Sequence, residues 1–446
     1  MLKRDIDNFT GFIFQEEEKI FFHAQNNIFY FITGRVGILA DILQKDLVAQ
    51  DYFLYGYTSD GYQIALYTGY DRRKISTNYK LKPALYIVSK SNIKQYDMST
   101  FQAVEFVGGT LNNLYEQKSI NTRYDNSQQC FIKVYPEKRK EFAIKIGNYD
   151  CKLIIRNVPS EISPSKMDLI IRYEFQDEVP LIEIKLVYNV LVNICRFMTN
   201  RKNVGFDNVK LFQIDKETKN WLCFADVCID FRCSSLTSKE FRNNILFDYL
   251  KDCIINLHTI VSSNEERKAT YMFDFYANSD MDYTVLSDDK IKNICSSIEC
   301  ELGFIKDLKG NENTNLTDLI MEVKKVIKTH RESQKKLEDK TYDMIFSSMS
   351  HWEMPNSRRI YLLYERNKIY MDILKNRTGL YCTEEMITEF VKFRNDITHG
   401  KYRTIDSSIA ITSYTLMALS YCCFLQRIGM RENELKRLFD ENRIGS

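Results

Sequence analysis

Residues 383–400, TEEMITEFVKFRNDITHG, form a segment whose helix can be predicted from both of its ends. Thr383 is a residue type that accepts a hydrogen bond from the free N–H groups at a helix start, and two glutamates follow it, where the helix dipole favours anions. Gly400 suits the position just after a helix, where the chain often turns left-handed. We therefore expect one helix over residues 384–399.

Apolar residues recur along this helix at intervals of four, three and four, which predicts one buried stripe. Its members are Met386, Phe390, Phe393 and Ile397. Asn395 and His399 are four residues apart and share a face. At about 100° per residue, each lies two positions past a stripe member, roughly opposite the core. Arg394 lies between them, so we expect all three polar side chains to point away from the core, toward solvent or a partner.

The helical pattern continues on both sides of this segment and covers the C-terminal part of the chain. The helix predicted over 406–428 is apolar nearly all round, which is typical of a helix at the centre of a bundle. The predicted helices span residues 288–306, 315–339, 341–350, 357–375, 384–399, 406–428 and 431–442.

The N-terminal part has short aromatic and β-branched runs that indicate strands. Thr58-Ser59-Asp60-Gly61 separates two of these runs, and Asp-Gly is a hairpin signal. Helices are expected at 181–198 and 241–261. Strands of this length favour a sandwich or a strongly twisted antiparallel sheet. The predicted strands span residues 28–33, 52–57, 62–67, 85–88, 131–135, 142–146, 152–156, 169–175, 210–214 and 222–231.

Together these patterns predict an α+β fold in two main parts, within the range expected for a chain of 446 residues. A β-rich domain with helical insertions occupies residues 1–262 and is expected to sense a trigger or to position a substrate. Residues 263–284 form a linker. An all-α bundle occupies residues 285–446.

Composition excludes several classes of protein. The chain carries 62 basic and 60 acidic residues, so it is not a uniformly basic nucleic-acid binder. It has no run of about 18 apolar residues and no secretory leader pattern, which favours a cytoplasmic protein without a membrane segment. The 12 cysteines include no C-x-x-C pair, as expected of free thiols in a reducing compartment. P-loop, G-x-G-x-x-G and G-x-S-x-G motifs do not occur.

One group of cysteines raises the question of a metal. Cys223, Cys228 and Cys233 are five residues apart, whereas zinc-binding pairs are usually separated by two to four residues. Alternation along a strand would also put neighbours on opposite faces. Buried thiols are therefore the preferred interpretation, and we expect neither a metal site nor a cofactor.

Arg394, Asn395 and His399 suit metal-free RNA cleavage, in which the 2′-OH attacks the adjacent phosphorus. A histidine with an ordinary pKa near about 6.5 can donate or accept a proton at neutral pH. A guanidinium can contact phosphate oxygens and oppose the charge that develops on the phosphorane. An amide can orient the ribose or phosphate. One histidine cannot easily make both proton transfers, but two copies of this face across a two-fold axis would supply two.

The stretch Arg394-Asn395-Asp396-Ile397-Thr398-His399 resembles the R-N-x-x-x-H motif of HEPN-domain ribonucleases. The following glycine and apolar helix are similar to the last helices of that all-α domain. The layout of a β-rich half before a HEPN-like half further resembles the ApeA type of bacterial anti-phage protein. The resemblance implies a metal-independent endoribonuclease that acts as a homodimer and halts growth when phage infection is sensed. It implies an abortive-infection toxin with RNA as its substrate, tRNA being one candidate, and a phage-derived trigger.

The resemblance also assigns roles to residues. It implies catalytic positions at Arg394, Asn395 and His399. Many members of the family carry an acidic residue on an earlier helix near the motif. The candidates for that residue are Glu299, Glu301 and Glu365.

Cationic residues near the motif are candidates for RNA contact. Lys392, Lys401 and Arg403 flank it. A second basic stripe lies on the predicted helix 315–339 and is more typical of a solvated face. It consists of Lys324, Lys328, Arg331 and Lys335.

Two other functions stay open. The helical domain could serve only to dimerise a binding or adaptor protein, in which case substitutions in the motif would leave function intact. The chain could also be a toxin controlled by a nucleotidyltransferase antitoxin.

Overall fold

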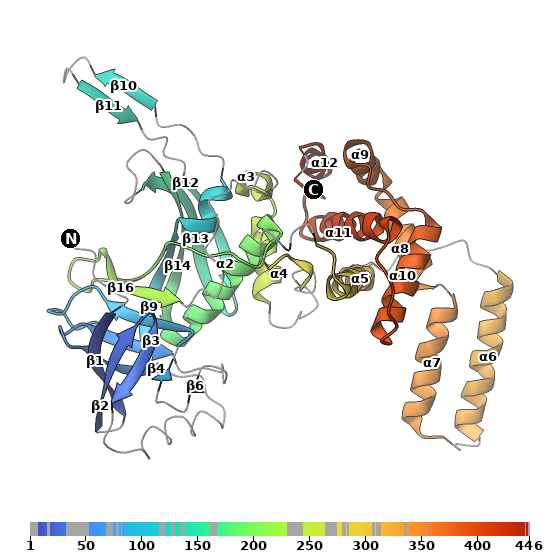
Figure 1. The fold of residues 1–446 in the computed structure, drawn as a ribbon, viewed down its shortest axis with the longest axis horizontal. Coiled ribbons are helices and arrows are strands. Elements are labelled where there is room, and N and C mark those ends of the chain that lie inside the picture. The colour runs from blue at the N-terminus through green and yellow to red at the C-terminus, as the bar shows by residue number, and fades with distance from the viewer. Residues whose placement is uncertain are drawn as a thin grey trace. The chain divides into compact units, whose positions relative to one another are not determined.

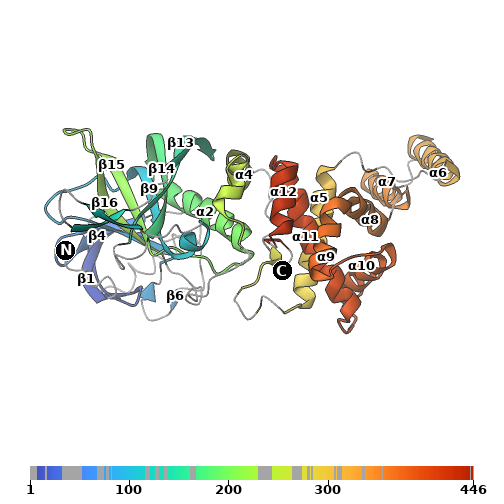
Figure 2. The ribbon, with the colours of Figure 1, turned by 90° about the horizontal axis from the view of Figure 1, so that it is seen from above.

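The computed structural model, drawn in Figures 1 and 2, describes the larger part of the chain. The described residues are 8–15, 18–32, 53–67, 75–76, 80–81, 83–115, 121–125, 130–134, 139–160, 167–229, 244–263, 274–278, 282, 285–305, 308, 314–333, 337–353, 355–441 and 443–444. Most of the predicted linker, 263–284, lies outside them.

The chain divides into two compact units that interleave along the sequence. One comprises Met1–Met198, Asn203–Glu240 and Leu257–Asn264. The other comprises Thr199–Lys202, Phe241–Asn256 and Glu265–Ser446. The first is β-rich and the second is helical, so the predicted α+β fold class is confirmed.

Within the described residues, fourteen strands of the first unit form one sheet, and every recorded strand pair is antiparallel. Of the two predicted arrangements, the single antiparallel sheet is therefore the one observed. The strands are β1 (Asn8–Gln15), β2 (Glu18–Gln25), β3 (Ile28–Ile32), β4 (Phe53–Thr58), β5 (Gln63–Tyr67), β6 (Ile75–Ser76), β7 (Lys80–Leu81), β8 (Leu85–Ser89), β9 (Thr100–Val107), β12 (Arg139–Ile146), β13 (Tyr149–Pro159), β14 (Met167–Pro180), β15 (Asn208–Ile214) and β16 (Trp221–Ile229). A separate pair consists of β10 (Asn121–Asp125) and β11 (Cys130–Val134).

The predicted hairpin between β4 and β5 is confirmed. Thr58 N–H donates to the Tyr62 carbonyl at 2.8 Å, and the Thr58 hydroxyl donates to Asp60 at 2.6 Å. Gly61 has a φ of +84°, a left-handed conformation that glycine adopts without steric cost. The Asp-Gly signal therefore identified the turn for a physical reason.

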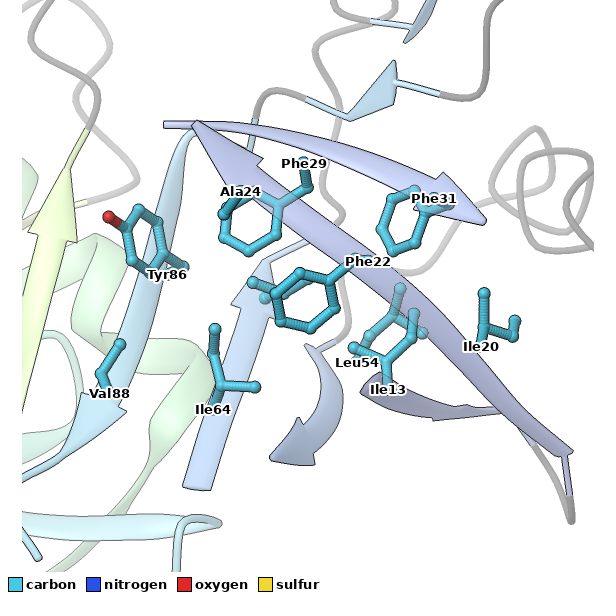
Figure 3. Close-up of a cluster of buried hydrophobic side chains, with 11 residues drawn as sticks. Ile13, Ile20, Phe22, Ala24, Phe29, Phe31, Leu54, Ile64, Tyr86 and Val88 are labelled. Atoms are coloured by element: carbon cyan, nitrogen blue, oxygen red, sulfur yellow. The ribbon is translucent and has the colours of Figure 1, made fainter. Parts of the chain in front are cut away.

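One face of β1–β5 and β8 carries a buried apolar cluster (Figure 3). Aromatic rings dominate it: the ring centroids of Phe22 and Phe29 are 5.1 Å apart, and those of Phe29 and Tyr86 are 5.2 Å apart. Such offset and edge-to-face contacts stabilise a core beyond the area that they bury. The members are Ile13, Ile20, Phe22, Ala24, Phe29, Phe31, Leu54, Ile64, Leu66, Tyr86 and Val88.

The predicted helix at 181–198 is observed as a 3₁₀ turn, Leu181–Glu183, followed by α2 (Ile184–Thr199). The ring of Tyr188 on α2 lies 6.3 Å from Phe106 of β9 and 5.9 Å from Phe206. Helix α2 thus lies against the sheet, as Figures 1 and 2 both show. The predicted helix at 241–261 is instead two shorter helices, α3 (Phe247–Leu250) and α4 (Ile254–Ser262), and residues 241–243 lie outside the described part.

The second unit contains helices close to those predicted from the sequence. Helix α10 packs against α5, α8 and α11, whereas α6 and α7 pack against each other. From residue 285 onward, the helices of the described residues are α5 (Asp288–Phe304), α6 (Thr314–Ser333), α7 (Asp339–Glu353), α8 (Asn356–Arg366), α9 (Lys368–Thr378), α10 (Glu384–Thr398), α11 (Ser407–Arg427) and α12 (Glu432–Asp440).

The single helix predicted over 357–375 is wrong, because the chain breaks at Asn367 between α8 and α9. Asn367 is buried, and its amide group donates to the Leu363 carbonyl at 2.9 Å. Its Oδ1 accepts a hydrogen bond from Gln426 of α11, also at 2.9 Å. A buried side-chain amide needs hydrogen-bond partners, and at the break between the two helices Asn367 finds them in Leu363 and Gln426.

Helix α11 is the buried centre of this unit, as predicted. Its hydroxyls bond to their own helix: Ser413 donates to the Ile409 carbonyl at 2.7 Å and Ser420 to the Leu416 carbonyl at 3.0 Å. Among the described helices, α11 is the one long and apolar enough to cross a membrane. Most of it is buried inside the unit, and the core helix of a globular protein has the same character.

Candidate functional site

Helix α10 begins and ends at the residues that the sequence indicated. The hydroxyl of Thr383 accepts a hydrogen bond from the Met386 N–H at 3.3 Å. Gly400 follows the helix with a φ of +75°. The Lys401 N–H donates to the Asp396 carbonyl at 2.9 Å and so closes the last turn. These two ends place His399 as the last residue before the left-handed turn.

The buried face of α10 differs by one residue from the predicted stripe. It consists of Ile387, Phe390, Phe393 and Ile397. Met386 is only partly buried, so its inclusion in the stripe was wrong. Ile387 precedes Phe390 by three residues, and Arg394 follows Phe390 by four. Arg394 therefore lies at the edge of the buried face, and the prediction that it points away from the core is also wrong.

Arg394 is held by two side chains of α5, one of which is in turn held by α8. Its Nε donates to the sulfur of Cys295 on α5 at 3.2 Å, and its Nη2 forms an ion pair with Glu299 on the same helix. Asn356, the first residue of α8, donates to the same Glu299 oxygen at 3.1 Å. Burial and the nearby Glu299 raise the pKa of the Cys295 thiol to about 11, so it is a neutral partner of the arginine. The guanidinium orientation is thus set within one chain.

The three acidic candidates are now distinguished by position. Glu299 contacts Arg394, as described. Glu301 is paired with Arg427 of α11 at 2.9 Å. Glu365 is paired with Lys368 at 3.2 Å. Glu299 is therefore the candidate that adjoins the motif.

Asn395 and His399 occupy the exposed face of α10, as the sequence predicted. Within the described part of the chain, the structure records no side-chain hydrogen bond for either residue. Both polar groups are consequently available to an incoming ligand or chain. They lie one helical turn apart, and Asn395 directly follows Arg394 in the sequence.

The cationic residues around the motif have carboxylate neighbours. Lys401 Nζ lies 3.1 Å from Asp396, and Arg403 Nη1 lies 3.2 Å from the same carboxylate. Lys392 lies 3.6 Å from Glu389 and Arg403 lies 3.8 Å from it. A hydrogen bond from Lys401, with the charge of Arg403, holds the pKa of Asp396 below its ordinary value. The candidate RNA-binding cations are thus close to the site but largely neutralised.

The basic stripe on α6 and the cysteines of β16 form neither a clear RNA-binding site nor a metal site among the described residues. On α6, Arg331 is paired with Asp339 and Asp343, and Lys328 lies 4.0 Å from Glu332. Lys335 lies outside the described residues. Cys223 and Cys228 are free thiols of β16, and Cys233 is also outside the described residues. No group of three or more metal-ligating side chains occurs in the part of the chain that the structure describes.

Several residues of this site were not identified from the sequence. Cys295 and Asn356 lie far from the motif in the chain, and neither has a local signal. Asp396 lies within the motif itself, and a carboxylate five residues before Lys401 could have indicated the pairing. Comparison with known proteins finds no family model, no curated protein and no solved structure that matches the chain.

Proposed function

We propose that this chain is a metal-independent endoribonuclease of the HEPN type, which cleaves RNA at a site built from two copies of the α10 face. The observation that supports it is the combination of a fixed Arg394 with exposed Asn395 and His399 at one helix end. These are the groups that intramolecular attack of a 2′-OH on phosphorus requires, and no metal is needed.

Each side chain has a distinct role in this mechanism. His399 acts as the general base toward the 2′-OH, or as the general acid toward the departing 5′-oxygen. Arg394, oriented before substrate arrives, stabilises the extra charge on the phosphorane. Asn395 orients the ribose or phosphate. Because one imidazole cannot easily make both transfers, the second histidine comes from the partner subunit in a homodimer.

The biological role follows the same proposal. The enzyme belongs to an anti-phage abortive-infection response in the cytoplasm, where a phage-derived trigger releases its activity. Cleavage of cellular RNA, with tRNA as one candidate, then stops growth. The β-rich unit senses the trigger or positions the RNA.

Purified full-length protein, incubated with total RNA in EDTA, tests the activity directly. Wild-type protein should cleave, and His399→Ala should lower the rate at least about a hundredfold, the contribution expected of a general acid–base group. His330→Gln is the matched control, because His330 is hydrogen-bonded to Tyr342 between α6 and α7. Equal cleavage by His399→Ala and wild-type protein would contradict the assignment of His399 as the general acid–base group.

A non-catalytic adaptor is the second candidate, because Arg394 and its cationic neighbours already have carboxylate partners within the chain. In that case the exposed α10 face is only a contact surface. Phage challenge of cells that carry His399→Ala or Arg394→Ala separates the two functions. Loss of protection supports the nuclease, and full protection supports the adaptor.

A further inference from the structure

Four aromatic side chains form a group on the outer face of strands β1, β2 and β4, which we term the aromatic platform. They are Phe12, Phe14, Phe21 and Tyr57. Strand register aligns three of them, because Phe12 is paired with Phe21 on one side and with Tyr57 on the other. Alternation along each strand puts this group on the opposite side of the sheet from the buried cluster of Figure 3.

The rings of the aromatic platform contact one another. Phe12 lies 5.3 Å from Phe14, 6.2 Å from Phe21 and 5.9 Å from Tyr57, measured between ring centroids. Phe21 nevertheless remains 56% exposed and Phe14 39% exposed. The solvent-facing side of an antiparallel sheet is ordinarily polar, and a contiguous exposed apolar group usually marks a binding surface.

Charge on this face favours an anionic partner. Lys19 Nζ lies 4.8 Å from the ring centroid of Phe12 and 6.0 Å from that of Phe14. Within the described residues, no carboxylate occurs at the outward positions of β1, β2, β3 or β4. At these described strand positions the face therefore combines aromatic rings with one positive charge, and the carboxylate of Asp97, from a loop, acts on Tyr55 of β4.

Backbone recognition is not available at the aromatic platform. Strand β1 is paired with β2 and β4, and β2 is paired with β1 and β3. Neither strand offers a free edge to which an extended peptide could add. A ligand must therefore be recognised by side chains alone, through ring stacking and the lysine.

We propose that the aromatic platform binds unpaired bases of single-stranded RNA by stacking, with Lys19 contacting the phosphate backbone. Aromatic rings joined to a nearby cation are the elements by which proteins hold single strands without base pairing. The inference rests on the proposed function for its choice of RNA, and it assigns substrate binding to the β-rich unit.

Fluorescence anisotropy with a labelled oligouridine of about 12 nucleotides tests binding separately from cleavage. Full-length His399→Ala protein should bind this strand more tightly than a duplex of the same length. Adding Phe21→Ala should weaken binding about fivefold to a hundredfold. Phe21→Trp should retain affinity and Phe21→Leu should lose it, because leucine is apolar but cannot stack. Ile93→Ala, at a loop position of the same unit that is 94% exposed, is the matched control.

The outcomes are distinct. Absence of single-strand binding would overturn the stacking proposal. Equal affinity of the wild-type protein and Phe21→Leu would also overturn it, and would indicate a general apolar surface for a protein partner. Binding by the platform without any RNA cleavage by wild-type protein would contradict the nuclease and keep this inference. Normal RNA affinity together with persistent cleavage in Phe21→Ala would overturn this inference and keep the nuclease proposal.

Discussion

Arg394 of α10 and Glu299 of α5 form an ion pair within a single chain, and Asn356 of α8 holds the same carboxylate. Three helices thus fix one guanidinium on the helix whose end carries the exposed His399. Nε and Nη2 are occupied, whereas the structure records no partner for Nη1 among the described residues. In the proposed mechanism, a phosphate oxygen would be contacted through Nη1 or the second N–H of Nη2.

Replacing Glu299 with Gln tests whether this ion pair positions Arg394. We expect the kcat for RNA cleavage to fall about 10- to 100-fold with little change in KM, because a misplaced catalytic group affects the transition state most. Glu365→Gln is the control, since its partner Lys368 lies outside the motif. An equal loss in both variants would indicate a general effect of charge.

Asp396→Asn should increase RNA affinity. The substitution releases Lys401 and Arg403 from their carboxylate partner, so both cations can contact phosphates. We expect binding about two- to tenfold tighter at low salt, with a steeper dependence of affinity on salt concentration. Anisotropy titrations at several salt concentrations measure both quantities. Unchanged or weaker binding would show that the carboxylate does not compete with RNA.

The same carboxylate makes a pH-dependent contribution to stability. The pKa of Asp396 is lowered below its ordinary value of 3.8 by its bond to Lys401 and the charge of Arg403. Because the pKa of Asp396 is lower in the native state, its ion pairs stabilise the fold above the ordinary pKa of 3.8. This stabilisation is lost as the pH falls through the native pKa. Thermal unfolding of wild-type and Asp396→Asn protein should therefore differ near neutrality and converge in acid. A constant difference across this range would contradict the linkage.

Gly400 and Gly379 form a natural pair for separating stability from activity. Each follows a helix with a φ of +75°, and a Cβ at either position would meet no atom within 4 Å. Alanine should cost about 1 kcal/mol at both positions, purely from the left-handed backbone. Only Gly400→Ala should also reduce RNA cleavage, because His399 precedes it. Equal effects on cleavage would place the helix end outside the site.

The ends of α10 could be predicted because capping is local: Thr383 and Gly400 each act within a few residues. The contacts of Arg394 were not predicted: it follows the buried Phe390 by four residues, which puts it at the edge of the buried face, where it reaches Cys295 and Glu299 of α5. Its partner Glu299 lies far away in the sequence.

The break at Asn367 was missed for a similar reason. The amide lies in a segment with a continuous helical pattern, and its partner Gln426 is on α11. The α+β class, in contrast, follows from patterns repeated along many segments, so an error in one strand or helix leaves it unchanged.

The central claim is that two α10 faces share one site, and a mixing experiment tests it most directly. Wild-type protein is allowed to exchange subunits with a ninefold excess of His399→Ala protein, and RNA cleavage in EDTA is measured per wild-type chain. If both subunits contribute a required histidine, the rate per wild-type chain should fall to about one tenth, because about one tenth of wild-type chains then have a wild-type partner. An unchanged rate per wild-type chain, with exchange verified, would contradict the shared site.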